Sequence, residues 1–484
     1  MRWTLEQVAQ ALGVAPPAGV DPVAWLAGVS IDSRTLHAGE LFLAIHGPRH
    51  DGHTFVAAAL AAGAPAAVVA RGRMAEYPED IRRRLLAVDD PLAALQKLAR
   101  QVRRKWAALG GGRRLVAVTG STGKTTTKEI LASLLGARLR VLKSEGNLNN
   151  EYGLPLTLLK LEDGHEAAVV EVGMSHRGEL ARLAEICEPE VGVVTNVAPV
   201  HLEFFSSVDE IALAKRELIE GLAGPAPVAV LNADDERVAR FAKVNLGKVI
   251  TFGLSAGAMF RAERVEDRGV HGSTFDLVHP RGCTPVELAL VGRHNVANAL
   301  AAVAAASVGD LTPTEIQRVL RGVSPAPMRG EVLVFDEKFT VINDCYNSNP
   351  VALASMIRDL AAMPNSRRRV LVAGEMLELG RGSTQWHLEA GQQAASAKLD
   401  WVVGVQGHAA ELVRGAVECG VPAERTKFFA SSEEAAAFVA GFVAAGDVVL
   451  VKGSRGVKME RIIEALRAKY TLSPESVTAA GGGH

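Results

Sequence analysis

The pattern of hydrophobic and polar positions becomes regular from about residue 91. The stretch PLAALQKLARQVRRKW (91–106) places Leu95, Leu98 and Val102 on one side of a helix, which predicts an amphipathic helix. A glycine-rich break follows, and RLVAV (114–118) then has the length and composition of a buried strand. Short apolar runs and helical stretches continue to alternate along the rest of the chain.

These apolar runs predict two successive series of strands. The first series comprises residues 114–118, 166–172, 191–196, 228–232 and 248–252, and the second comprises 339–344, 369–374, 401–405 and 447–453. Strands separated by helices are typical of parallel sheets that carry helices on both faces. We therefore expect an α/β protein.

The breaks between these patterns predict three domains. The segment SPAPM (324–328) separates the two strand series, and the residues before the first helix show short strands and many turns instead. We expect a small α/β domain at residues 1–88, a central domain with a parallel or mixed sheet at 89–323, and a Rossmann-like domain at 324–484. A chain of 484 residues is too long for one hydrophobic core, which agrees with this division.

The composition argues against several classes of partner. The chain has 53 Lys and Arg against 54 Asp and Glu, so no overall positive charge favours nucleic acid or anionic lipid. Its longest apolar stretch, residues 57–70, is broken by Gly63 and Pro65 and is shorter than the ~20 residues that span a bilayer. The N-terminus lacks the apolar core of a secretory signal, and no heptad pattern is present. We expect a cytoplasmic monomer.

The four cysteines point to neither a disulfide framework nor a zinc site. They lie far apart in the sequence and form no C-x-x-C pair, at positions 187, 283, 345 and 419. Such spacing fits a protein of a reducing compartment.

A glycine-rich stretch, TGSTGKTTTKE (119–129), follows the strand predicted before it. Gly123, Lys124 and Thr125 match the end of the phosphate-loop pattern G-x-x-x-x-G-K-[ST], although Val118 stands where that pattern has its first glycine. The strand, loop and helix come in the order that the motif requires. The alternative is an ordinary glycine turn before a helix.

This loop predicts a nucleotide site. Lys124 would reach the β- and γ-phosphates, and the Thr125 hydroxyl would bind Mg²⁺. Backbone N–H groups of residues 120–124, at the start of the next helix, would surround phosphate oxygens. The residues expected at the nucleotide are Thr119, Gly120, Ser121, Thr122, Gly123, Lys124 and Thr125.

Three further side chains are candidates for a metal site. Glu171 interrupts an apolar run near its carboxyl end, where ligands bind in open α/β sheets, although a solvent-exposed strand end is the alternative. His201 follows the next strand and could face the same crevice, or it could be a loop histidine. Lys215 lies on the apolar stripe formed by Ile211 and Leu218, so its amine points inward or reaches back to water.

Together these residues resemble a known family, the ATP-dependent Mur ligases of peptidoglycan synthesis. The similar stretches are TGSTGKTTTKE (119–129), EVG (171–173), TNVAPVHLE (195–203), AKRE (214–217), GRHNVANALAA (292–302), PMRGE (327–331) and NDCYNSNP (343–350). The phosphate loop of this family has the shorter form T-G-[ST]-x-G-K-[ST], which accounts for Val118. One departure is Arg216, where the family more often has glycine.

The resemblance implies roles for the candidate residues. Thr125, Glu171, His201 and Lys215 would help to hold two Mg²⁺ ions, with Lys215 carbamylated. It implies ATP contacts from Asn295 and Asn298 to adenine, from Asp344 to ribose and from Arg329 to the γ-phosphate. The residues expected to act in catalysis are Lys124, Lys215, His201 and Arg329.

Within the family, several stretches resemble the ligase that acts last in the cytoplasm. They are SIDSR (30–34), NLNNEYGLP (147–155), AGEMLELG (373–380) and KGSRGVKME (452–460). That ligase uses ATP to join D-alanyl-D-alanine to UDP-N-acetylmuramoyl-tripeptide through an acyl phosphate. The D-N-P-R motif typical of the preceding ligase is absent from the sequence.

The resemblance also assigns substrate residues. The N-terminal domain would bind the UDP-sugar, with Ser33 and Arg34 as candidates, and Asn147, Asn149 and Asn150 would face the muramoyl-peptide. For these asparagines a loop of turn-favouring amides is an alternative. Two other functions remain open at this point: a sister ligase that adds a single amino acid, and a regulator in which nucleotide drives a conformational change.

Overall fold

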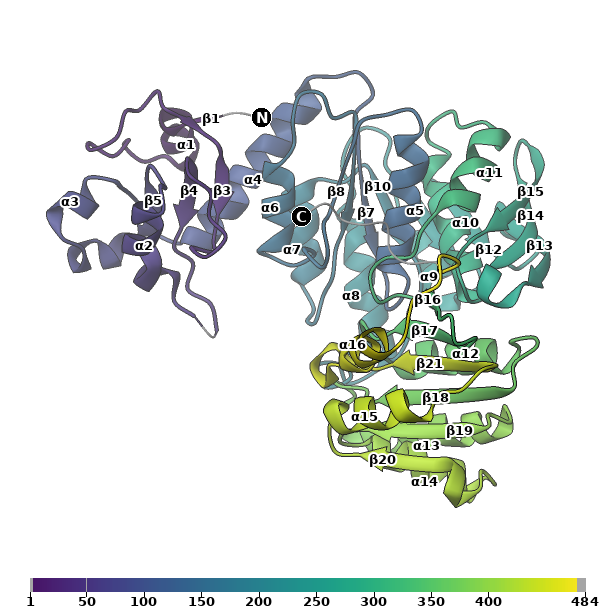
Figure 1. Cartoon of the computed structure of the whole chain (residues 1–484). Coiled ribbons are helices and arrows are strands. Elements are labelled where there is room, and N and C mark those ends of the chain that lie inside the picture. The colour runs from purple at the N-terminus through teal and green to yellow at the C-terminus, as the bar shows by residue number, and fades with distance from the viewer. Residues whose placement is uncertain (1–2, 49, 477–484) are drawn as a thin grey trace.

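Figure 1 shows a central region and two regions that flank it. The computed structural model describes residues 3–48 and 50–476, and within them the strands form four sheets. The N-terminal region, in purple, lies to one side of the central region, and the C-terminal region, in green to yellow, lies below it. No helix among the described residues is long and apolar enough to cross a membrane.

The N-terminal region contains a parallel sheet in the order β3-β4-β5-β6 and a short antiparallel pair, β1 and β2. Its elements are β1 (Trp3–Thr4), α1 (Leu5–Leu12), β2 (Trp25–Leu26), β3 (Gly28–Ser30), β4 (Glu40–Leu43), α2 (Val56–Ala61), β5 (Ala67–Ala70), α3 (Glu79–Arg82) and β6 (Leu85–Val88). Thr4 and Gln7 form a capping box that starts α1, because each side chain bonds the backbone N–H of the other.

The central region is built on one mixed sheet in the order β15-β14-β13-β12-β11-β10-β7-β9-β8. Its strands are β7 (Arg114–Thr119), β8 (Val141–Lys143), β9 (Ala167–Glu171), β10 (Val191–Val194), β11 (Val228–Asn232), β12 (Lys248–Gly253), β13 (Phe260–Asp267), β14 (Ser273–His279) and β15 (Gly282–Leu288). Its helices are α4 (Pro91–Ala108), α5 (Lys124–Gly136), α6 (Gly153–Leu159), α7 (Glu179–Cys187), α8 (Val208–Glu220), α9 (Glu236–Ala239), α10 (His294–Ala306) and α11 (Pro313–Gly322).

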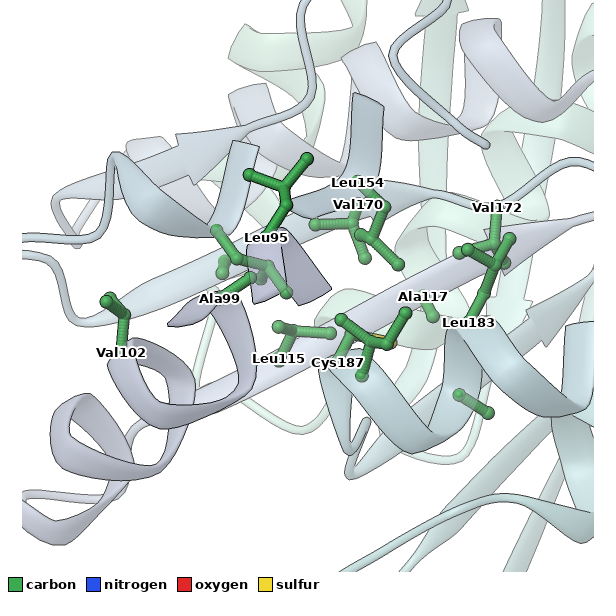
Figure 2. Close-up of a cluster of buried hydrophobic side chains, with 14 of the residues drawn as sticks. Leu95, Ala99, Val102, Leu115, Ala117, Leu154, Val170, Val172, Leu183 and Cys187 are labelled. Atoms are coloured by element: carbon green, nitrogen blue, oxygen red, sulfur yellow. The ribbon is translucent and has the colours of Figure 1, made fainter. Parts of the chain in front are cut away.

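Alternation along β7 divides the central core in two. Leu115 and Ala117 pack on one face with α4, α6, α7 and α8, and Figure 2 shows part of this cluster. Val116 and Val118 pack on the other face with α5, α10 and α11. Successive side chains of a strand point to opposite faces, so β7 is buried on both sides. Covering both faces removes the strand from solvent, as the apolar run predicted.

Helix α4 joins the N-terminal and central regions through one continuous core. Leu95 and Leu98 of this helix belong to the same buried cluster as Leu41 of β4, Leu86 of β6 and Leu115 of β7. The amphipathic helix predicted at residues 91–106 is therefore confirmed, but its apolar side contacts two sheets rather than one.

The C-terminal region has a sheet in the order β16-β17-β21-β18-β19-β20, parallel except for the β16–β17 pair. Its elements are β16 (Glu331–Val334), β17 (Thr340–Asp344), α12 (Pro350–Ala361), β18 (Arg368–Gly374), α13 (Ser383–Ser396), β19 (Trp401–Val405), α14 (Ala409–Glu418), β20 (Thr426–Phe429), α15 (Ser432–Phe442), β21 (Asp447–Lys452) and α16 (Glu460–Lys469). One face packs against α12, α13 and α14 and the other against α15 and α16.

The predicted α/β class and the predicted strands of both series are confirmed. The apolar pattern did not reveal the antiparallel strands β13, β14 and β15, which extend the central sheet. These strands carry charged and polar residues on their exposed face, and a register shift between Glu263 and Glu266 interrupts the alternation of β13.

Candidate functional site

The phosphate loop requires glycine at two positions. Gly120 and Gly123 have φ angles of 150° and 79°, which side-chain-bearing residues rarely adopt. A Cβ atom on Gly120 would lie 1.8 Å from Thr195 Oγ1, and one on Gly123 would lie 2.1 Å from Asn298 Oδ1. Val118, in contrast, is a fully buried residue of β7. The position where the longer phosphate-loop pattern has its first glycine therefore belongs to the strand.

Asn196, two residues beyond the carboxyl end of β10, holds the phosphate loop. Its backbone oxygen accepts a hydrogen bond from Ser121 N at 3.0 Å, and its Oδ1 accepts one from Thr122 N at 3.0 Å. Its amide also donates to the Thr122 hydroxyl at 2.8 Å. Two of the backbone donors expected to bind phosphate are therefore turned toward Asn196. Thr127 N donates to the Gly123 carbonyl at 2.9 Å, whereas the N–H groups of Lys124, Thr125 and Thr126 have no acceptor among the described residues and can receive an anion.

Lys124 folds back over the loop, where both a carboxylate and a guanidinium act on its amine. Its Nζ donates to the Gly120 carbonyl at 2.9 Å. Burial lowers the pKa of the Lys124 amine, the carboxylate of Glu171 opposes that effect, and Arg329 adds to it. Since Arg329 belongs to the C-terminal region, charges from two regions already act on one amine.

Glu171 is the centre of a buried hydrogen-bond network. At the end of β9 it is 2% exposed, and it accepts from Thr125 Oγ1 at 2.7 Å and from Asn149 Nδ2 at 2.8 Å. Its own N–H donates to Ser144 Oγ at 3.1 Å, and the buried Lys128 amine donates to the Ser144 carbonyl at 2.6 Å. The expected approach of Thr125 and Glu171 is therefore present, with a hydroxyl and a carboxylate side by side.

Lys215 is buried, as the apolar stripe of α8 predicted. It is 2% exposed, and among the described residues no hydrogen bond or ion pair to its amine is found. Burial lowers the pKa of this amine well below its ordinary value, and the charge of Lys124 lowers it further. This arrangement favours the uncharged form of the Lys215 amine.

A cavity of about 280 Å³ lies between the central and C-terminal regions. Its lining includes residues Ser121–Thr126 of the phosphate loop and α5, Asn295 and Asn298 of α10, and Arg329, Asp344 and Lys452 of the C-terminal region. The structure thus brings together the residues expected at phosphate, adenine and ribose, and the phosphate loop and Asp344 are more than 200 positions apart in the sequence.

Local contacts position the residues of this cavity. Asn295 donates to the Val291 carbonyl at 2.7 Å, and Asn298 donates to Asn295 Oδ1 at 2.9 Å. The Arg329 guanidinium lies 4.1 Å from the ring centre of Tyr346. Asp344 accepts from the Lys452 amine at 2.5 Å. Lys452 was not among the predicted site residues, although it begins the stretch KGSRGVKME.

His201 lies elsewhere. It is not among the described residues that line the cavity, and its Nδ1 lies 2.6 Å from Glu378 Oε2 of the C-terminal region. Within residues 3–48 and 50–476, no cluster of three or more His, Cys, Asp or Glu side chains could hold a metal ion. Beside the Glu171 carboxylate the structure places the hydroxyl of Thr125 as a further oxygen donor.

A second, larger cavity of about 1090 Å³ lies between the N-terminal and central regions. Asp32 and Thr35 line it, as does Leu148 from the asparagine-rich loop. The predicted Ser33 and Arg34 fall between Asp32 and Thr35 in sequence without being among the lining residues. The Arg34 guanidinium is exposed and forms an ion pair with Asp32 at 2.7 Å.

The three asparagines of the loop at 147–150 have different surroundings. Asn149 bonds to Glu171 rather than facing solvent, Asn147 is exposed, and Asn150 Oδ1 accepts from Gly153 N at 2.9 Å at the start of α6. For Asn150, the turn-forming role that the composition allowed is present.

Comparison with known proteins agrees with this geometry. Three domain descriptions match: Mur ligase family, catalytic domain, over residues 26–103; Mur ligase middle domain over 118–306; and Mur ligase, glutamate ligase domain, over 328–455. The chain belongs to the Mur ligase family, which confirms the family inferred from the motifs.

Individual proteins of known name match nearly the whole chain. The UDP-N-acetylmuramoyl-tripeptide–D-alanyl-D-alanine ligase of Escherichia coli (strain K12) is 36% identical over 452 residues, covering 92% of this chain and 95% of that protein. The crystal structure of MurF from Acinetobacter baumannii aligns with a TM-score of 0.85 at 31% identity, covering 97% of this chain and 99% of that one. MurF from Thermotoga maritima, solved in complex with ADP, aligns with a TM-score of 0.78 at 29% identity, covering 91% and 97%.

Proposed function

We propose that this chain is an ATP-dependent ligase that joins D-alanyl-D-alanine to UDP-N-acetylmuramoyl-tripeptide in peptidoglycan precursor synthesis. The observation that carries the proposal is the shared cavity, in which the phosphate loop meets Arg329 and Asp344 of the C-terminal region. Relatives with that activity in their names cover nearly the whole chain, which supports the same substrates here.

The reaction activates a carboxylate that is otherwise a poor electrophile. The terminal carboxylate of the tripeptide attacks the γ-phosphorus of ATP, which releases ADP and leaves an acyl phosphate. The amine of D-alanyl-D-alanine attacks the acyl carbon, and the tetrahedral intermediate expels inorganic phosphate as the amide forms. Lys124 and Arg329 neutralise charge on the transferring group, which is the main contribution of a protein to phosphoryl transfer.

The donor set around Glu171 fits Mg²⁺, which prefers hard oxygen ligands. Thr125, Glu171, His201 and a carbamate on Lys215 would help to hold two Mg²⁺ ions. Bound Mg²⁺ would offset the negative charge of the phosphates. The burial of Lys215, which lowers the pKa of its amine, supports the carbamate, because a neutral amine reacts with CO₂ while an ammonium does not.

We assign the binding of adenine to Asn295 and Asn298 and the binding of ribose to Asp344. The shape of the phosphate loop depends on Thr119, Gly120 and Gly123. Ser33, Arg34, Asn147, Asn149 and Asn150 remain our candidates for the nucleotide-sugar and peptide side. The cavity between the N-terminal and central regions supports this placement, since Asp32 and Leu148 line it beside these residues.

The organisation of the chain is part of the proposal. We divide it at 88/89 and 323/324 into a UDP-sugar-binding domain, an ATP-binding domain and a ligase domain. We place the reaction in the cytoplasm, where ATP and nucleotide-linked precursors occur, and we expect a monomer. Limited proteolysis and light scattering of the full chain would check the boundaries and the mass.

One assay tests the function. Phosphate release from ATP is measured with UDP-N-acetylmuramoyl-tripeptide, with D-alanyl-D-alanine, with both and with neither. We expect release only when both are present. Release with a single amino acid in place of the dipeptide would favour a sister ligase, and release with neither substrate would favour a nucleotide-driven regulator.

A further inference from the structure

Arg329 lines the nucleotide cavity from the turn before β16 and lies over an aromatic ring. The ring is that of Tyr346, in the loop after β17, and its centre lies 4.1 Å from the guanidinium carbon. Within residues 3–48 and 50–476, the guanidinium forms no hydrogen bond or ion pair. A cation this close to the face of an aromatic ring is attracted by the electrons of the ring. Tyr346 is therefore the side chain that orients Arg329.

Arg368 of the same region shows a different arrangement. Its guanidinium lies 4.3 Å from the ring centre of Phe442, but it also donates to both carboxylate oxygens of Asp447, from Nε at 2.8 Å and from Nη2. A carboxylate partner neutralises the charge of a guanidinium and occupies its donors. A ring face attracts the charge without an acceptor oxygen, so the N–H donors of Arg329 stay available to an anionic ligand.

Backbone hydrogen bonds connect the turn of Arg329 to the loop of Tyr346. Tyr346 N donates to the Met328 carbonyl at 3.2 Å, and Gly330 N donates to the Asn343 carbonyl at 2.9 Å. The residues on both sides of Arg329 are thus bonded to the end of β17 and to the loop that follows it. These bonds keep the ring beside the guanidinium.

The hydrophobic core does not account for the position of Tyr346. Its side chain is half-buried, and among the described residues it belongs to neither hydrophobic cluster of the C-terminal region. In that same part of the chain its hydroxyl has no hydrogen-bond partner. Tyr346 is also not among the described residues that line the nucleotide cavity. The contact that explains this ring is the one with Arg329.

We propose that Tyr346 is a positioning residue whose ring holds the Arg329 guanidinium in the nucleotide cavity, with its donors free for the γ-phosphate of ATP. The inference rests on the proposed function, which assigns Arg329 to that phosphate. ADP lacks the γ-phosphate, so the ring matters for the binding of ATP and not for that of ADP. The segment that carries Tyr346 also carries Asp344, the residue assigned to ribose, and so serves two parts of the nucleotide.

The first test compares nucleotide affinities without turnover. Full-length wild type, Tyr346→Leu and Tyr346→Phe are titrated by calorimetry with Mg·ADP and with Mg·AMP-PNP, a non-hydrolysable analogue of ATP. From the strength of a cation–π contact, we expect Tyr346→Leu to weaken AMP-PNP binding about 3- to 10-fold and to leave ADP binding unchanged. Tyr346→Phe should bind both as the wild type does, because it keeps the ring. An equal loss for both nucleotides, or no loss for either, would overturn the proposal.

The second test changes the electrons of the ring and keeps its shape, which guards against a folding defect. Trifluorophenylalanine is incorporated at position 346 and compared with Tyr346→Phe. Fluorine withdraws electron density from the ring face and so weakens its attraction for a cation. We expect the fluorinated protein to lose AMP-PNP affinity as Tyr346→Leu does. An affinity equal to that of Tyr346→Phe would mean that the ring acts by packing alone, and it would overturn the proposal.

Phe442→Leu is the matched control. It removes the ring beside Arg368, a cation–π contact of similar length in the same region, and neither residue is among the described residues that line the nucleotide cavity. Both nucleotide affinities should stay at the wild-type values. A selective loss of AMP-PNP affinity in this variant would contradict the specific role of Tyr346.

The Arg329 background separates this inference from the proposed function. Arg329→Met should weaken AMP-PNP binding, and Tyr346→Leu added to it should have no further effect, since the residue that the ring orients is gone. A further loss in the double variant would contradict the positioning role. If Arg329→Met leaves AMP-PNP affinity unchanged, the inference fails together with the γ-phosphate contact. Wild-type phosphate release that needs both substrates would support the proposed function even then.

Discussion

Gly123→Ala should damage the nucleotide site through two separable effects. Gly123 precedes α5 with a φ of 79°, and an alanine in that conformation costs about 1–2 kcal/mol. Its Cβ would also lie 2.1 Å from Asn298 Oδ1, so the Asn298 amide must move and lose its bond to Asn295. Overpacking of this kind costs about 1–3 kcal/mol, and the lost hydrogen bond about 1 kcal/mol.

Gly178→Ala is the matched control. Gly178 precedes α7 with a φ of 87°, and nothing lies within 4 Å of the added Cβ, so this variant has the strain without the collision. Urea denaturation followed by tryptophan fluorescence should show a loss of about 1–2 kcal/mol for Gly178→Ala and about 2–4 kcal/mol more for Gly123→Ala. Titration calorimetry with Mg·ADP should show at least a tenfold loss of affinity for Gly123→Ala only. Equal stability and equal ADP affinity in the two variants would refute the steric argument.

Three further predictions concern buried groups. Thr125→Val leaves the Glu171 carboxylate with one hydrogen bond fewer, so denaturation should show a loss of about 1–3 kcal/mol, whereas Thr125→Ser should stay near wild type. Leu115→Ala opens a cavity in the core shown in Figure 2 and should cost about 2–5 kcal/mol by the same measurement, with Mg·ADP affinity retained. For Lys215, the folded pKa lies below the unfolded one, so the unfolded state binds more protons between the two values and stability rises with pH through that window. In CO₂-free buffer the wild type should therefore gain stability relative to Lys215→Met as the pH increases toward the ordinary pKa of lysine, and parallel curves would contradict the lowered pKa of the buried amine.

Activity of the Lys215 variant tests the carbamate. Lys215→Ala should lose most activity, and a short carboxylate such as acetate should restore part of it, because it can supply the missing oxygens. A fully active Lys215→Ala would exclude the modified lysine, and the site of Thr125 and Glu171 would then have to act without it.

Local signals in the sequence predicted much of the fold. Runs such as 114–118 and 447–453 were recognisable because central parallel strands are buried on both faces and exclude polar residues. Strand β14 was missed because its buried residues alternate with polar, partly exposed ones, so it forms no continuous apolar run. The shared core between α4 and the N-terminal sheet could not be predicted either, since an apolar helix face does not say which partner covers it.

The candidate functional site likewise has parts that the sequence predicted and parts that only the tertiary structure decided. The sequence by itself determined the phosphate loop and the inward lysine of α8, because glycines in a turn and a charged residue on an apolar stripe are properties of a short segment. Only the tertiary structure decided that Asn196 holds the loop, that Lys452 pairs with Asp344, and that His201 meets Glu378 rather than the cavity. These contacts join strand ends and loops that are distant in the chain, and their distances depend on how sheets and regions pack, which no local pattern of residues encodes.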